Sequence, residues 1–234
     1  MVGNLRIVLV EPKEAGNVGA TARVMKNFGF RELWIVGQHP PLQPLAGWWA
    51  SGADDVVTSA RFVPTLHAAI ADTQLAIATT SARGRTTPVD LSPSELSETF
   101  AALGESETLA LVFGREDSGL AREELMLCQR TAGIPTDREF PTMNLAQAVG
   151  VFCYALSGPA KAGPHTERPN TAILERLHER AESLLLEIGF LQANNPDRIY
   201  DDVRAIAGRA DLDAREVTIL LGILHQMEWK IRGQ

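Results

Sequence analysis

Four short apolar runs constrain the fold of this chain more than any other feature of its sequence. Each run has four to six residues, and none alternates regularly between polar and apolar side chains. Strands that are buried on both faces have this pattern, and they occur in parallel sheets covered by helices on both sides. The runs are residues 5–10, 33–36, 75–80 and 109–113. The sequence therefore predicts an α/β fold with a parallel sheet.

The segment between the first two runs indicates how they are connected. Residues 11–19 contain a proline and two glycines, Gly16 and Gly19, and are predicted to form a loop. Residues 20–28 have apolar side chains at helical spacing, and Gly29 is placed to end that helix. Strand, loop, helix and strand make a βαβ unit, whose crossover is right-handed.

Capping and spacing predict further elements before residue 140. Residues 65–71 and 122–128 have helical spacing, and Ser92 with Glu95 opens another helix as a capping box. Residues 131–135 form a last short strand that ends on a proline.

Residues 139–156 combine a turn with a helix start. A turn-forming run at 140–144 precedes apolar residues at helical spacing from Leu145, and Asn144 is a good N-cap. The free backbone N–H groups at such a helix start suit an anionic or polar ligand. By spacing alone an ordinary capped core helix is the better explanation, so a ligand site here needs support from other loops.

The composition changes after residue 157. Residues 158–169 are rich in Gly and Pro and have no periodicity, which predicts a linker. Three helical patterns follow from residue 170. We therefore expect an α/β domain over residues 1–157, a linker over 158–169 and a small helical C-terminal extension over 170–234.

Charge and cysteine content limit the class of protein. The net charge of −7 argues against a protein that coats nucleic acid, so any nucleic-acid surface must be a local patch. Cys128 and Cys153 lie in apolar helical patterns, which predicts buried free thiols. The first apolar run is too short for a signal peptide, and no run is long enough to span a membrane. We expect a cytoplasmic protein with no membrane partner.

Four loops at the carboxyl ends of predicted strands contain the residues that suggest a site. They are residues 16–19, 79–85, 114–119 and 140–144. None contains GxGxxG or GxxxxGK[ST], so dinucleotide and P-loop sites lack their motif. The five histidines have no metal-ligand spacing, and no metal is expected. Ser118 lacks the surroundings of a nucleophile elbow.

These loops offer glycines, hydroxyl groups, backbone amides and arginines. Such a set binds a preformed reactive cofactor and positions a polyanionic substrate, without making a nucleophile of its own. Glu116 and Asp117 could form an acid–base pair, but we prefer Glu116 as the partner of an arginine or of backbone N–H groups. Arg83 and Arg85 are either ligand-binding side chains or solvated ones.

Three motifs in order resemble those of the SPOUT 2′-O-ribose RNA methyltransferases, most closely the TrmJ-type tRNA methyltransferases. The motifs are GNVGATAR at 16–23, LVFGREDSGL at 111–120 and MNLAQAV at 143–149. The resemblance covers residues 5–156 and, more loosely, two segments of the C-terminal extension, 185–191 and 220–224. Each motif alone is a weak signal, and the three together are a strong one.

The resemblance implies an α/β-knot fold, in which the C-terminal part of the parallel sheet is tucked through a loop as a trefoil knot. Such knots are rare exceptions among protein folds. The resemblance also implies S-adenosyl-L-methionine as the cofactor, tRNA as a partner, and a homodimer with the site at the subunit boundary.

The resemblance also assigns roles to residues at the motif positions. The expected cofactor-binding residues are Thr79, Thr80, Ser81, Gly114, Ile134, Pro141, Thr142 and Met143. The expected catalytic residues are Arg23, Asn17, Glu116, Thr142 and Asn144, and the expected RNA-binding residues are Lys13, Arg23, Arg83, Arg85 and Arg115.

Physical chemistry refines three of these expectations. Because a guanidinium pKa exceeds about 12, we interpret Arg23 first as a phosphate clamp and oxyanion stabiliser, and its role as a base stays open. Thr142 stands where the family commonly has serine, which keeps the hydroxyl group and adds a methyl group. Trp48 and Trp49 could stack on a base, or belong to the core or to a dimer interface.

The implied activity is 2′-O-methylation of a tRNA ribose, at cytidine or uridine 32 of the anticodon loop by analogy. One alternative is a related enzyme for another tRNA or rRNA position. Another is a catalytically silent RNA-binding protein with the same fold, and a third is a small-molecule α/β enzyme.

Overall fold

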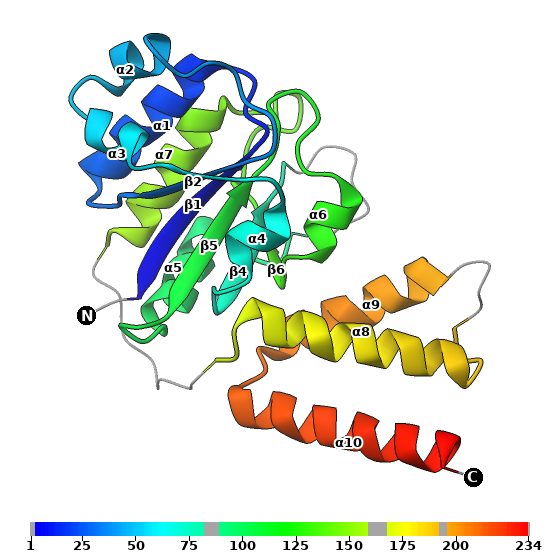
Figure 1. Ribbon diagram of the computed structural model, residues 1–234. Helices are drawn as coiled ribbons and strands as arrows, with labels where there is room; N and C mark the ends of the chain where they lie inside the picture. Colours follow the sequence, from blue (N-terminus) through cyan, green and yellow to red (C-terminus); the bar gives the residue numbers. More distant parts are fainter. Residues whose placement is uncertain (1–2, 82–88, 159–167, 192–195, 234) are drawn as a thin grey trace.

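The computed structural model describes residues 3–81, 89–158, 168–191 and 196–233, and its centre is a parallel sheet (Figure 1). The sheet has six strands in the order β3-β2-β1-β5-β4-β6, and every pairing is parallel. The strands are β1 (Asn4–Val10), β2 (Glu32–Val36), β3 (Arg61–Val63), β4 (Leu75–Thr79), β5 (Thr108–Phe113) and β6 (Arg130–Ala132). The predicted parallel sheet is confirmed. The edge strand β3 was not predicted, because three residues are too few to form a recognisable pattern.

Helices cover both faces of the sheet, as expected for strands without polar alternation. On one face lie α1 (Ala15–Asn27), α5 (Pro93–Ala101) and α7 (Leu145–Leu156), with α2 (Leu45–Ala50) and α3 (Asp54–Thr58) beside α1. On the other face lie α4 (Leu66–Ile70) and α6 (Arg122–Met126). Ile7 and Leu9 of β1 pack into the first layer, whereas Val8 and Val10 pack into the second.

The direction of strand addition reverses at β1. The chain proceeds from β1 to β2 and β3 on one side, and β5, β4 and β6 lie on the other. In open α/β sheets, ligands bind beyond the carboxyl ends of the strands at such a point. The segments that follow β1 and β5 therefore mark the expected place of a site.

The structure corrects the prediction for residues 11–19. Helix α1 begins at Ala15, so Gly16, Asn17 and Gly19 lie in its first turns and not in a loop. Gly19 is required by packing, because a Cβ atom there would lie 2.1 Å from the carbonyl oxygen of Ala46. This glycine reflects close contact between α1 and α2, which local sequence patterns do not show.

Strand β6 lies between two segments of the loop that follows β4. The Thr80 N–H donates to the Ala132 carbonyl at 3.0 Å, and the Gly133 N–H donates to the Leu91 carbonyl at 2.9 Å. A trefoil knot requires the chain to pass between the arms of a loop in this way. The middle of this loop, residues 82–88, lies outside the described residues, so the knot stays a prediction.

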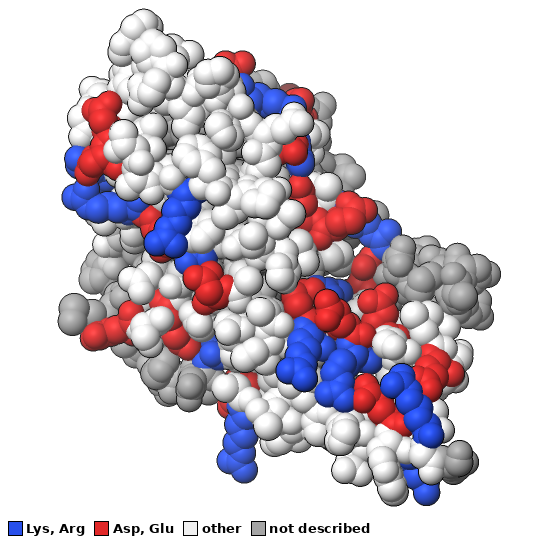
Figure 2. Space-filling model, viewed as in Figure 1, with Lys and Arg blue, Asp and Glu red and all other residues white. Residues whose placement is uncertain are grey.

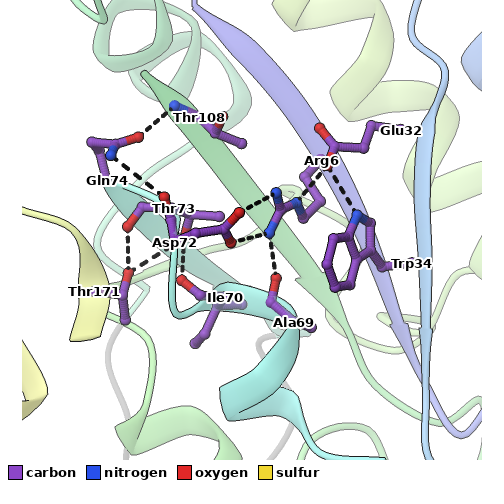
Figure 3. Close-up of polar contacts among 10 residues, drawn as sticks. All are labelled: Arg6, Glu32, Trp34, Ala69, Ile70, Asp72, Thr73, Gln74, Thr108 and Thr171. Carbon is purple, nitrogen blue, oxygen red and sulfur yellow. Dashed lines mark hydrogen bonds and ion pairs between the residues drawn. The ribbon is translucent and has the colours of Figure 1, made fainter. Parts of the chain in front are cut away.

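Three helices form the C-terminal extension: α8 (Thr171–Glu187), α9 (Pro196–Ala210) and α10 (Ala214–Arg232). Thr171 attaches them to the sheet domain, since its N–H and its hydroxyl both donate to the Thr73 carbonyl, at 2.7 and 2.8 Å (Figure 3). Thr73 lies two residues before β4, so the helices are fixed at the amino end of that strand. The predicted linker, residues 158–169, lies largely outside the described residues.

Acidic and basic side chains alternate over the C-terminal helices (Figure 2). Ion pairs join Arg180 to Glu228 at 2.5 Å and Arg232 to Glu187 at 2.6 Å, and another joins Arg204 to Glu175. Basic side chains of the extension therefore lie among acidic ones in this view.

Both cysteines are free, as predicted. Cys153 is buried in α7, and burial raises the pKa of its thiol to about 12. Among the described residues, no helix combines the length and the apolar character needed to cross a bilayer.

Arg6 of β1 is a buried cation that joins several elements (Figure 3). It donates to the carboxylate of Glu32 at 2.9 Å, to both oxygens of Asp72 at 2.6 and 3.1 Å, and to the Ala69 carbonyl at 2.6 Å. Its guanidinium carbon lies 4.2 Å from the centre of the Trp34 ring. Arg6 therefore ties β1 to β2 and to the segment between α4 and β4.

The substitution Arg6→Met should lower the free energy of unfolding by about 1 to 2 kcal/mol, because it removes the hydrogen bonds that Glu32, Asp72 and the Ala69 carbonyl accept from Arg6. Urea titration measures this loss. Arg31→Met is the matched control, since Arg31 pairs with Asp55 at the surface and should change stability by about 0.5 kcal/mol or less. Equal losses in both variants would contradict the role given to Arg6.

Candidate functional site

A cavity of about 490 Å³ opens at the carboxyl ends of β4, β5 and β6, a size in the range of small-molecule sites. Every residue that the sequence predicted for cofactor binding borders this cavity. These residues are Thr79, Thr80 and Ser81 after β4, Gly114 after β5, and Ile134, Pro141, Thr142 and Met143 before α7. Three segments far apart in the sequence thus surround one space.

The sequence prediction missed the apolar part of the cavity wall. Phe113, Leu145, Ala148 and Phe152 also line the cavity, and the rings of Phe113 and Phe152 meet edge to face at 5.9 Å. In the sequence they belong to apolar strand and helix patterns. Such patterns do not distinguish a cavity wall from a closed core.

A chain of side-chain hydrogen bonds connects the three motifs beside the cavity. The side-chain amide of Asn144 donates to Oδ1 of Asn17 at 2.9 Å. The Asn17 amide in turn donates to Oε1 of Glu116 at 2.9 Å. The sequence had grouped these three residues only by the family resemblance, and the structure places them in contact.

Asn144 also caps α7, as predicted. Its Oδ1 accepts the backbone N–H groups of Ala146 at 3.0 Å and Gln147 at 3.3 Å. One amide side chain therefore satisfies two free donors of the helix start and orients Asn17.

Glu116 holds the start of α1. Its carboxylate accepts the backbone N–H of Lys13 at 2.9 Å and that of Glu14 at 3.3 Å, besides the Asn17 amide. This arrangement agrees with the preferred prediction of backbone N–H partners over an acid–base pair. Asp117 is exposed, and its hydrogen bond from the Ser118 hydroxyl lowers the pKa of its carboxyl group.

Arg115 was predicted to contact RNA, and the structure places it differently. Its guanidinium donates to both oxygens of Glu124 at 2.9 Å and to Glu11 at 2.7 Å. Hydrogen bonding to Glu124 is the main cause that raises the pKa of Arg115 above its ordinary value. Its side chain is only 19% exposed. The cation is already paired with two carboxylates within the chain, which leaves it fewer free donors for a phosphate group; its role in RNA binding stays a prediction.

The remaining predicted cations lie apart from the cavity wall. Arg23 is exposed on α1, does not line the cavity, and forms no hydrogen bond or ion pair with any described residue. Lys13 is exposed directly before α1. Arg83 and Arg85 lie outside the described residues. A single chain therefore assembles the cavity and the Glu116–Asn17–Asn144 contacts but leaves Arg23 at a distance from the wall.

Trp48 and Trp49 lie on α2 at the surface, with exposed fractions of 73% and 58%. A role in the core, one of the three alternatives, is therefore wrong. Trp49 lies over the first turn of α1, because a Cβ atom on Gly16 would be 3.1 Å from its indole nitrogen.

The chemistry of this site is that of positioning. Its groups are hydroxyls, backbone amides, carboxamides and a carboxylate occupied by N–H donors. Within the part of the chain that the structure describes, no three His, Cys, Asp or Glu side chains are grouped so that they could hold a metal ion.

Comparison with known proteins decides the family. The model of the SpoU rRNA methylase family matches residues 4–154, and that of the TrmJ tRNA methyltransferase C-terminal domain matches residues 172–234. The chain belongs to the SpoU methylase family, in its TrmJ branch.

Relatives in the TrmJ branch match along the whole chain. The tRNA (cytidine/uridine-2′-O-)-methyltransferase TrmJ of Klebsiella pneumoniae is 38% identical, and that of Salmonella typhimurium is 37% identical, with all of both chains covered in each case. The crystal structure of TrmJ from Z. mobilis has a TM-score of 0.80 at 32% identity and covers 95% of this chain and 98% of that one. The predicted family is confirmed, and the C-terminal helices belong to the match.

In this SpoU-family site Asn144 both caps α7 and contacts Asn17, and the free energy of unfolding of its variants tests these two roles. Asn144→Asp keeps the capping oxygen but replaces the donor to Asn17 with a carboxylate oxygen that faces Oδ1 of Asn17, so it should lower the free energy of unfolding by about 1 kcal/mol. Asn144→Ala removes the cap as well and should cost at least about 1 kcal/mol. Thermal unfolding measures both. Asn170, which caps α8 through Ile173, provides the matched pair away from the site, and Asn170→Asp should change stability by less than about 0.5 kcal/mol. Equal losses in Asn144→Asp and Asn170→Asp would show that the contact with Asn17 adds nothing to the stability of the fold.

Proposed function

We propose that this protein transfers a methyl group from S-adenosyl-L-methionine to the 2′-hydroxyl group of a tRNA ribose. The observation that carries the proposal is the joining of the three motifs around one cavity, in a chain that matches TrmJ proteins over its full length. The names of those relatives specify cytidine or uridine in tRNA as the target.

The donors and walls of the cavity suit this cofactor. Phe113, Leu145 and Phe152 offer an apolar wall for an adenine ring, and the hydroxyls of Thr80, Ser81 and Thr142 border the same space. When bound, the cofactor supplies a methyl group that its sulfonium makes electrophilic. The residues of the chain then have to hold that group in line with a sugar oxygen, which is a task of alignment.

We propose a homodimer in which the site is completed at the subunit boundary. Arg23 supports this, because it is exposed, unpaired among the described residues and outside the cavity wall of its own chain. Placed at the cavity of a second copy, its guanidinium would bind the phosphate next to the target ribose and stabilise the developing oxyanion. Lys13, which directly precedes α1, would add a second phosphate contact.

The target position is proposed by analogy as nucleotide 32 of the anticodon loop. A solved structure described as giving insight into methylation of C/U34 on tRNA has a TM-score of 0.52 at 26% identity and covers 66% of this chain and 94% of that one. It matches this chain less well than the TrmJ structure does, which weakens the case for position 34. We place the reaction in the cytoplasm, in keeping with a tRNA substrate.

Arg23→Ala should lower the rate of methyl transfer by about 10²- to 10³-fold, the loss expected when one stabilising donor is removed. Its affinity for S-adenosylhomocysteine, measured by calorimetry, should stay within about twofold of the unmodified protein, because Arg23 does not line the cavity. Arg31→Ala is the control: it removes another exposed arginine and should keep full activity.

Mass spectrometry of bulk tRNA identifies the methylated nucleotide. A transcript with 2′-deoxycytidine at position 32 should accept no methyl group there. The proposal is overturned if the unmodified protein binds S-adenosylhomocysteine but methylates no tRNA.

A further inference from the structure

The side chain of Arg115 lies between the cavity loop and the start of α1. We define the Arg115 clamp as Arg115 with its two carboxylate partners, Glu11 and Glu124. Glu11 directly follows β1, and Glu124 belongs to α6. The three residues therefore connect the carboxyl ends of β1 and β5 to α6, which lies on the face of the sheet opposite α1.

The arm to Glu124 closes the loop at residues 114–119. Arg115 also exchanges backbone hydrogen bonds with Gly119, at 3.2 and 2.8 Å, and a Cβ atom on Gly114 would lie 2.2 Å from the Gly119 carbonyl carbon. Although burial opposes ionisation of Glu124, its hydrogen bonds from Arg115 and from the Ala121 N–H keep the pKa of its carboxyl group below the ordinary value. The loop that forms part of the cavity wall is thus held closed by a charged, two-point contact.

The arm to Glu11 holds the chain where it enters α1. Glu11 has a backbone φ of +43°, in the left-handed region that non-glycine residues adopt at an energetic cost. Its carboxylate lies 2.7 Å from Nε of Arg115. The next residue of the loop, Glu116, accepts the N–H groups of Lys13 and Glu14. Two consecutive loop residues therefore fix the segment that leads into the helix of Asn17 and Arg23.

We propose that Arg115 is a positioning residue that couples cofactor binding in the cavity to the placement of α1. This inference rests on the proposed function, since it assigns the cavity to the cofactor and α1 to the RNA. Arg115 itself borders the cavity. Its role there is to set the relative position of the two parts through separate arms, without contacting the RNA or the transferred group. A purely structural role would affect both parts together.

The two arms can be separated by substitution. Glu124→Met should weaken S-adenosylhomocysteine binding at least tenfold in calorimetry, because the wall loop loses its two-point contact. Glu11→Met should leave that affinity within twofold and lower the rate of methyl transfer at saturating cofactor at least tenfold. Arg115→Met should show both effects, and Arg115→Lys should lie between it and the unmodified protein. Glu123→Met, at the exposed neighbour of Glu124, is the matched control.

Binding of tRNA provides a readout that distinguishes a positioning residue from a phosphate ligand. Arg115→Met should leave the salt dependence of tRNA binding unchanged, because it removes no phosphate contact, whereas Lys13→Ala should weaken binding and reduce the salt slope. A reduced slope in Arg115→Met, or equal losses of affinity and rate in the Glu11 and Glu124 variants, would overturn the proposal.

Failure of the proposed function is recognised separately, by an unmodified protein that methylates no tRNA. The role of the Arg115 clamp is then tested by measuring hydrogen exchange of the backbone amides in the first turns of α1. Glu11→Met should speed that exchange and Glu123→Met should not. Exchange at the same rate in both would also overturn the proposal, provided that circular dichroism shows both variants folded.

Discussion

The carboxylate of Glu116 is the contact on which the arrangement of the site depends. Helix α1 has no side-chain cap at Glu14, and Glu116 supplies an acceptor at this end from about a hundred residues away in the sequence. Through Asn17 and Asn144 the same carboxylate is connected to the start of α7. The positive ends of two helices are therefore fixed relative to one loop, which is the kind of rigidity that an alignment reaction requires.

Local sequence patterns were sufficient for the elements that depend on local physics. The buried runs became strands, Ser92 and Glu95 form their capping box, and Asn144 caps α7. Features set by tertiary contact were missed. The start of α1 depends on Glu116 and on close packing against Ala46. The carboxylate partners of Arg115 were not foreseen either, because Glu11 is distant from it in the sequence. The residues around the cavity were predicted through the family resemblance, and periodicity alone would have assigned them to loops and core.

An acidic protein that acts on RNA has to concentrate its cations. Three of the predicted phosphate ligands lie within the described residues. Arg115 is paired with two carboxylates, whereas Lys13, before α1, and Arg23, on α1, are exposed. Few phosphate contacts release few counterions, so specific alignment at the site has to contribute more to recognition than overall charge does.

The two ends of the sheet serve different purposes. At the amino ends, Arg6 and Thr171 tie strands and the C-terminal extension together, whereas the cavity lies at the carboxyl ends. All described residues that line the cavity lie between Thr79 and Phe152, so the extension contributes none of them. The cavity proposed for the cofactor is therefore a feature of the sheet domain, which the model of the SpoU rRNA methylase family matches over residues 4–154.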